Sequence, residues 1–284
     1  MSLSVDKALR KAQSHVKAGE LAEAEELYKQ VMSKFPKNKK AMQGYQKLKA
    51  GITSKGSLGN ELPQEQIDEL INLYNKGQFE EVLLKVKPLI GLFQNAIILH
   101  NLQGASYAAI QRYDAAIDSY KQAIKIQPDY ADAYSNMGAA LKNKGDLRAA
   151  IGSYKQAIKI KPDFAEAHSN MGITLRETGE LNAAIDSYNQ AIKIKPDYAE
   201  AYNNLGNALR DKEELDAAIG SYKRALKIKP DYAEAHNNMG IALKDKGDLD
   251  AAIESFQQAI KIKPDYAEAH HNLSFAFLNS GRLN

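Results

Sequence analysis

The sequence has no cysteine and no tryptophan among its 284 residues. Without cysteine the chain can form no disulfide framework, no thiolate metal site and no cysteine nucleophile, and it does not need an oxidising compartment. An excess of one charge is also missing, because 38 basic residues face 35 acidic ones and leave a net charge of +3. This balance favours neither nucleic acid nor an anionic membrane as a partner.

Long apolar runs are absent as well. No stretch approaches the roughly 18–20 apolar residues that span a bilayer, and the amino terminus lacks the basic and apolar segments of a secretory signal. Apolar residues still make up 44% of the chain, which is enough to build a packed core. The sequence therefore predicts a packed cytoplasmic protein that is not bound to a membrane.

An internal repeat dominates the sequence. Segments 131–164 and 233–266 are identical at 24 of 34 positions, so they are expected to fold alike. In both halves of each segment apolar residues recur at steps of three and four, which is the period of an amphipathic helix. Each repeat is thus predicted to be a pair of helices. Five prolines mark the 34-residue period: Pro128, Pro162, Pro196, Pro230 and Pro264.

Glycine and acidic residues mark the ends of these helices. A glycine follows the first helix of most repeats, where a left-handed backbone favours it; the positions are Gly145, Gly179, Gly247 and Gly281. Glu213 takes this place in one repeat, and a left-handed backbone there would cost about 1 kcal/mol relative to glycine. Asp163 and Glu166, with their equivalents, have the spacing of a capping box at the start of the first helix.

At these positions the chain resembles the tetratricopeptide repeat family. The family's pattern of large, small and proline positions is matched throughout one repeat, by Tyr202, Leu205, Gly206, Leu209, Ala218, Tyr222, Ala225 and Pro230. The resemblance implies an all-α fold, an α-α superhelix in which antiparallel helix hairpins stack as a solenoid. First helices then line the concave face and second helices the convex one.

The resemblance also divides the chain into segments. We expect N-terminal helices of the same kind over 5–49, a flexible connection over 50–62 and a degenerate helix pair over 63–96, where Pro88 should kink or end the second helix. Five consecutive repeats follow over 97–266, and 267–284 holds the first helix of a sixth. That last helix carries Leu273, Phe275, Phe277 and Leu278 with no polar cap after it, so we expect either a longer parent polypeptide or two copies that cover each other's ends.

A ladder of asparagines is the candidate binding site. One asparagine recurs at the same place on five first helices, predicted to face the concave groove: Asn136, Asn170, Asn204, Asn238 and Asn272. A side-chain amide can pair with both the N–H and the C=O of an extended peptide, whatever the peptide's side chains. Similar ladders occur in the repeat regions of O-linked N-acetylglucosamine transferases, which this chain resembles without a catalytic domain. The alternatives are that duplication copied the asparagine passively, or that it bonds a neighbouring helix.

Seven further positions of the same face are predicted to belong to the peptide-binding site, four in a basic row and three beside it. A basic row of Lys142, Arg176, Arg210 and Lys244 is expected to form solvated ion pairs with the acidic residues beside it. Ile173 and Ile241 could form apolar pockets that Asn207 interrupts. The acidic row of Glu166, Glu200, Glu234 and Glu268 is interpreted as helix capping.

No catalytic motif accompanies these rows. His100, His168, His236 and His270 share a repeat position with Tyr134 and Tyr202, which marks it as a packing position rather than a metal ligand. The sequence therefore predicts a noncatalytic scaffold for extended peptide segments, with no cofactor. The alternatives are the substrate-recruiting region of a larger glycosyltransferase or sulfotransferase, and a self-assembling structural module.

Overall fold

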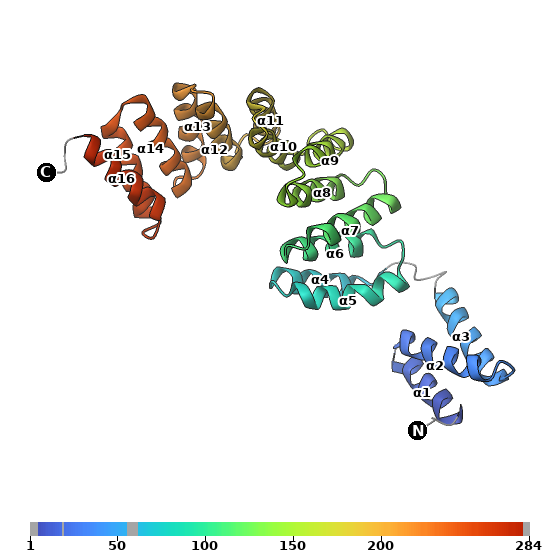
Figure 1. The fold of residues 1–284 in the computed structure, drawn as a ribbon. Helices are drawn as coiled ribbons and strands as arrows, with labels where there is room; N and C mark the ends of the chain where they lie inside the picture. Colours follow the sequence, from blue (N-terminus) through green and yellow to red (C-terminus); the bar gives the residue numbers. More distant parts are fainter. Residues whose placement is uncertain (1–4, 19, 56–61, 281–284) are drawn as a thin grey trace. The chain divides into compact units, whose positions relative to one another are not determined.

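The computed structural model describes residues 5–18, 20–55 and 62–280, and these ranges hold sixteen α-helices and no β-strand (Figure 1). The all-α prediction is confirmed. The chain divides into two compact units, residues 1–106 and 107–284, which are described separately. In the described part, no helix is both long enough and apolar enough to cross a bilayer.

The N-terminal unit contains two groups of helices, each with its own core. Tyr28 and Val31 lie in the core shared by the first group, which is α1 (Val5–Ala18), α2 (Leu21–Lys34) and α3 (Lys39–Lys55). Leu70, Val82 and Leu99 lie in the core of the second group, which is α4 (Gln64–Asn75), α5 (Phe79–Leu92) and α6 (Ile97–Ala109).

Two expectations for this unit are corrected. Residues 50–55 belong to α3 and are not a connection, because a single Gly51 costs a helix only about 1 kcal/mol. Residues 56–61 of the expected connection lie outside the described residues. Pro88 was expected to kink or end its helix, and the second alternative is wrong, since α5 continues to Leu92; proline removes one helical hydrogen bond, while Val82, Leu83 and Val86 anchor the helix in the core.

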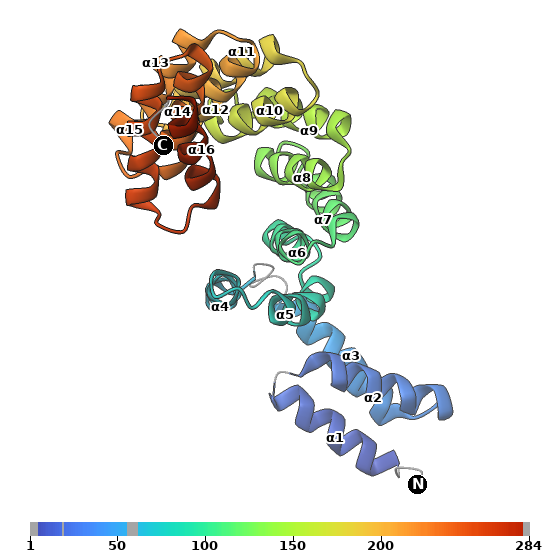
Figure 2. The same ribbon diagram turned by 60° about the vertical axis from the view of Figure 1, so that its left-hand side comes forward.

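The C-terminal unit is a stack of helix hairpins. Its helices are α7 (Tyr113–Ile126), α8 (Ala131–Lys144), α9 (Leu147–Ile160), α10 (Ala165–Glu177), α11 (Leu181–Ile194), α12 (Ala199–Asp211), α13 (Leu215–Ile228), α14 (Ala233–Lys246), α15 (Leu249–Ile262) and α16 (Ala267–Asn279). Each first helix packs on the second helix of its own hairpin and on that of the preceding one, so the hairpins lie side by side (Figures 1 and 2). This is the predicted solenoid of antiparallel hairpins.

The contacts between hairpins set the direction of curvature. Successive first helices also touch each other, α8 with α10, α10 with α12, α12 with α14 and α14 with α16. Among the described residues, no pair of successive second helices makes contact to the same extent. First helices are therefore closer together and line the inner side of the arc, while α9, α11 and α13 lie toward its outer side (Figure 1).

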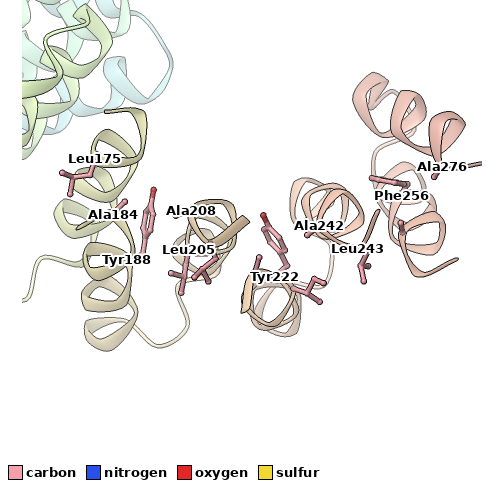
Figure 3. Packing of buried hydrophobic residues seen from close by; sticks show 14 of the residues in the cluster. Leu175, Ala184, Tyr188, Leu205, Ala208, Tyr222, Ala242, Leu243, Phe256 and Ala276 are labelled. Atoms are coloured by element: carbon pink, nitrogen blue, oxygen red, sulfur yellow. The ribbon is translucent and has the colours of Figure 1, made fainter. Parts of the chain in front are cut away.

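An aromatic ring packed on glycine joins the two helices of each hairpin. The Tyr222 ring of α13 lies so close to Gly206 of α12 that a Cβ there would meet the ring carbons at 2.5–2.8 Å. Gly138, Gly172 and Gly240 meet Tyr154, Tyr188 and Phe256 in the same way. Figure 3 shows Tyr188, Tyr222 and Phe256 inserted between helices beside small residues such as Ala208 and Ala242.

The turns confirm one prediction and correct another. Gly145, Gly179 and Gly247 have positive φ, and Glu213 adopts φ 63° in the same place; Gly281 lies outside the described residues. The predicted capping boxes are wrong, because each first helix of this unit has an aromatic N-cap whose side chain makes no capping bond. Pro162 and Asp163 occupy the middle of a turn closed by Phe164 N–H to Lys161 C=O at 3.2 Å, so Asp163 precedes the cap.

Candidate functional site

The five asparagines of the ladder lie near the middle of α8, α10, α12, α14 and α16, the helices of the inner side. All five are half-buried. They share this setting because the 34-residue repeat places each at the same turn of its helix. Their hydrogen bonds nevertheless differ along the stack.

Two of the asparagines are tied to the preceding repeat. Asn238 Nδ2 donates to Asn203 Oδ1 at 3.1 Å, and Asn272 Nδ2 donates to Asn237 Oδ1 at 3.0 Å. For these two positions, bonding to a neighbouring helix is what the structure shows. Asn136 also has an interaction partner. The expectation of five open amides is therefore too simple.

The other two asparagines differ. Within the described part of the chain, neither Asn170 nor Asn204 has a hydrogen bond to its side-chain amide; the hydroxyl of Thr174 donates to the backbone oxygen of Asn170. Asn238 and Asn272 bond the asparagine that lies 35 residues earlier in the chain, and the residue at the equivalent position is serine for the other two, Ser135 for Asn170 and Ser169 for Asn204. A serine hydroxyl is shorter than a carboxamide. The free amides are thus the ones whose opposite residue is the shorter one.

Asn237 is the centre of a buried polar network between α14 and α16. Its side chain is fully buried; it accepts from Asn272 and donates through Nδ2 to Glu268 Oε1 at 3.2 Å. Tyr266 also interacts with Asn237 and Glu268, and burial raises the pKa of its phenol. A satisfied network of this kind fixes the relative position of two helices, so the amides of this end of the stack serve packing.

The basic row forms ion pairs, as predicted. Lys142 Nζ lies 3.5 Å from Glu177 Oε1, and Arg176 Nε lies 2.5 Å from Asp211 Oδ2, so both pairs join successive first helices. Arg210 and Lys244 instead pair with the next residue of their own helix, at 3.7 Å with Asp211 and 3.5 Å with Asp245. The row is thereby neutralised, and it offers no strong field to an acidic partner.

The remaining predicted site residues are only partly available. Ile173 and Ile241 are half-buried and pack against the hydrophobic core, which leaves part of each side chain exposed. Asn207 is not free, because its Oδ1 accepts a hydrogen bond from the buried Tyr222 hydroxyl at 2.8 Å. Burial raises the pKa of Tyr222 far above its usual range, so this hydroxyl remains a donor.

The acidic row and the histidines have structural contacts. Glu166 and Glu200 lie 3.9 and 4.0 Å from Lys195 and Lys229 of the following turn, which corrects their interpretation as helix caps. His168, His236 and His270 have Nε2 within 2.8–3.2 Å of a proline carbonyl in the turn before their helix. These bonds agree with a packing position. Over residues 5–18, 20–55 and 62–280, no three His, Asp or Glu side chains are grouped so as to hold a metal ion.

Sequence reasoning missed the serine and asparagine positions that precede the ladder. The signal was present, since Ser135, Ser169, Asn203 and Asn237 change from serine to asparagine along the chain. Their meaning depends on which residue of the next repeat each one faces. Only the packing of successive first helices provides that information.

Family models match most of the chain. A model described as TPR repeat matches residues 104–145, 142–175, 174–210, 206–247 and 242–281, and one described as tetratricopeptide repeat matches residues 8–38.

Two curated proteins are similar over about a quarter of the chain. One is the probable UDP-N-acetylglucosamine–peptide N-acetylglucosaminyltransferase SEC of Arabidopsis thaliana, 37% identical over 76 residues, which are 26% of this chain and 8% of that protein. The other is the Hsp70–Hsp90 organizing protein of Triticum aestivum, 32% identical over 73 residues, which are 26% of this chain and 13% of that protein. The matched region is thus a small part of each relative.

Solved structures share the fold. A crystal structure of MamA is 30% identical with a TM-score of 0.53, covering 58% of this chain and 96% of that one. YrrB, described as a TPR protein with an unusual peptide-binding site, is 20% identical with a TM-score of 0.53, covering 66% of this chain and 96% of that one. At this identity YrrB shows a common fold and no more.

Proposed function

Because the chain belongs to the tetratricopeptide repeat family, we propose that it is a noncatalytic scaffold that holds an extended segment of another protein against the inner face of its C-terminal unit. The observation that carries this proposal is the pair of unbonded amides at Asn170 and Asn204, on two successive helices of that face. A half-buried amide without a partner loses hydrogen bonds to water, and a peptide backbone can replace them.

The spacing of the two helices suits an extended chain. Packed helices lie on the order of 10 Å apart, and an extended peptide advances about 3.3 Å per residue. Asn170 and Asn204 would therefore meet the backbone at positions about three residues apart. Since the basic row is neutralised by ion pairs, backbone recognition rather than charge sets the affinity.

The test compares variants that change these amides in two ways. Peptides are first selected on the intact chain from a random 15-residue library, and their affinities are measured by fluorescence anisotropy. Asn170→Ala with Asn204→Ala should weaken binding about tenfold for each amide, because each loses two hydrogen bonds of about 0.7 kcal/mol.

Ser169→Asn provides the sharper variant. This variant leaves Asn204 in place but puts an asparagine at position 169, where it can accept a hydrogen bond from Asn204 as Asn203 does from Asn238. The amide of Asn204 is then occupied, so peptide binding should weaken. Asn203→Ser is the matched converse, because it releases the amide of Asn238 and should not weaken binding. Library peptides that bind all of these variants equally would refute the proposal.

A second candidate rests on the similarity to the Arabidopsis protein, which is a probable N-acetylglucosaminyltransferase. In that case the chain would be the substrate-recruiting region of a larger glycosyltransferase or sulfotransferase. The length of the natural reading frame beyond residue 284 distinguishes the two candidates.

A further inference from the structure

The last first helix, α16, departs from the others in the two rows of the inner face. Phe275 stands where the preceding repeats have Ile173, Asn207 and Ile241, and Leu278 stands where they have the basic row. Both side chains are exposed, Phe275 to 47% and Leu278 to 63%. The inner face thus changes from ion pairs to an apolar surface at α16, defined here by Phe275 and Leu278.

The apolar surface is not the place where a further second helix would pack. In the four preceding repeats that contact is made by a glycine, with the ring of the second helix close above it. In α16 the same position is Ser274, whose Cβ occupies the space that the ring fills over Gly240, where a Cβ would lie 2.6 Å from a ring carbon. A helix that carries Tyr or Phe as the others do would not fit on Ser274 without a shift.

Charges near the apolar surface are already matched. Lys244 Nζ lies 5.4 Å from the centre of the Phe275 ring and 3.5 Å from Asp245, so the cation that borders the surface has both an aromatic and an acidic neighbour. An acidic partner residue would gain little here. Large apolar side chains are what the exposed areas of Phe275 and Leu278 favour.

We infer that the segment held by the inner face carries a large apolar side chain, aliphatic or aromatic, that packs on Phe275 and Leu278. The inference rests on the proposed function and names the class of its ligand. The apolar surface continues the two rows of the inner face, so one extended chain can cross both. Helices α12 and α16 are two repeats apart, on the order of 20 Å. In the bound peptide, the apolar residue therefore lies about six residues from the residue that meets Asn204.

The experiment uses the peptides selected from the random library on the intact chain. In an alanine scan of each bound peptide, one large apolar position should account for a loss of about tenfold or more. Phe275→Ser with Leu278→Lys, which restores a cation to its row, should remove that dependence. Leu84→Lys is the matched control, since Leu84 of α5 is 76% exposed and lies outside the site.

A second readout does not depend on removing the apolar surface. Phe275→Trp gives the chain its only tryptophan, and its emission should shift to shorter wavelength as a selected peptide is added. Binding that depends on Asn204 but not on any apolar peptide residue would overturn this inference and leave the proposed function intact. Failure to select any peptide would overturn both.

A second copy of the chain is the other candidate that could cover the apolar surface. Sedimentation velocity of the intact chain should give a monomer whose mass is unchanged by Leu278→Lys. A dimer that Leu278→Lys dissociates would assign the apolar surface to a second copy of the chain and refute the inference.

Discussion

The contact between Tyr222 and Gly206 predicts that glycine-to-alanine substitution has different effects on the two helices of one hairpin. Gly206 lies in α12 under the Tyr222 ring, whereas Gly220 lies in α13 with no atom within 4 Å of an added Cβ. Both glycines are inside a helix, so alanine should gain about 0.8–1 kcal/mol of helix propensity at either position. Only at Gly206 does the methyl group meet a ring, at 2.5–2.8 Å.

The magnitude follows from overpacking. Tyr222 is fully buried and its hydroxyl is bonded to Asn207, so the ring cannot swing aside without losing contacts. Overpacking of this kind costs about 1–3 kcal/mol. Because the propensity gain is common to both variants, Gly206→Ala should be less stable than Gly220→Ala by about this amount.

Urea denaturation followed by circular dichroism at 222 nm measures the difference. Gly220→Ala should raise the midpoint above that of the parent chain, and Gly206→Ala should lie clearly below Gly220→Ala. Combining Gly206→Ala with Tyr222→Leu should reduce the penalty, because the smaller side chain makes room for the methyl group. Equal midpoints for the two alanine variants would refute the packing of the ring on α12.

Three further predictions concern backbone strain and pH. Glu213→Gly should stabilise the chain by about 1 kcal/mol in the same denaturation assay, because φ is 63° there; a loss of stability would contradict this. Burial lowers the pKa of His100, whose Nδ1 has no partner in the described part of the chain. The unfolded state therefore binds the proton more readily than the folded state does. The free energy of unfolding should decrease as the pH falls below about 6.5, because protonation of His100 favours the unfolded state. His100→Tyr should flatten that dependence of the urea midpoint, and an unchanged slope would argue against it. Burial raises the pKa of Tyr232 to about 12, so the folded state keeps its proton and loses stability as the pH rises above about 10. Absorbance at 295 nm should show tyrosinate at pH 11 below the level of an unfolded control, and full ionisation of a folded chain at that pH would refute it.

The inner face shows why a repeated residue need not have a repeated role. Asn204 and Asn238 occupy the same position of the equivalent helices α12 and α14, yet the first has an unbonded amide and the second donates to Asn203. The difference comes from the preceding repeat, which offers Ser169 to one and Asn203 to the other. A substitution one repeat away can therefore open or close a binding amide without touching it.

The sequence by itself determined the helices, their period and several of their ends. Apolar residues at steps of three and four are compatible with an amphipathic α-helix and not with a β-strand. The left-handed turns at Gly145, Gly179 and Gly247 follow from the conformational freedom of glycine. The pairing of Arg210 and Lys244 with the carboxylate that follows each of them was also predictable from the sequence. These features depend on neighbours along the chain or on the repeat period.

Tertiary structure decided which side chains remain available. Asn207 was expected on the open face, but the buried Tyr222 hydroxyl requires an acceptor and donates to its side-chain carbonyl oxygen. Asp163 has the spacing of a cap, yet the turn with Pro162 closes one residue later and places Phe164 at the helix start. A hydrogen bond between repeats depends on the distance and orientation of two packed helices, and neither quantity is contained in the spacing of residues along one of them.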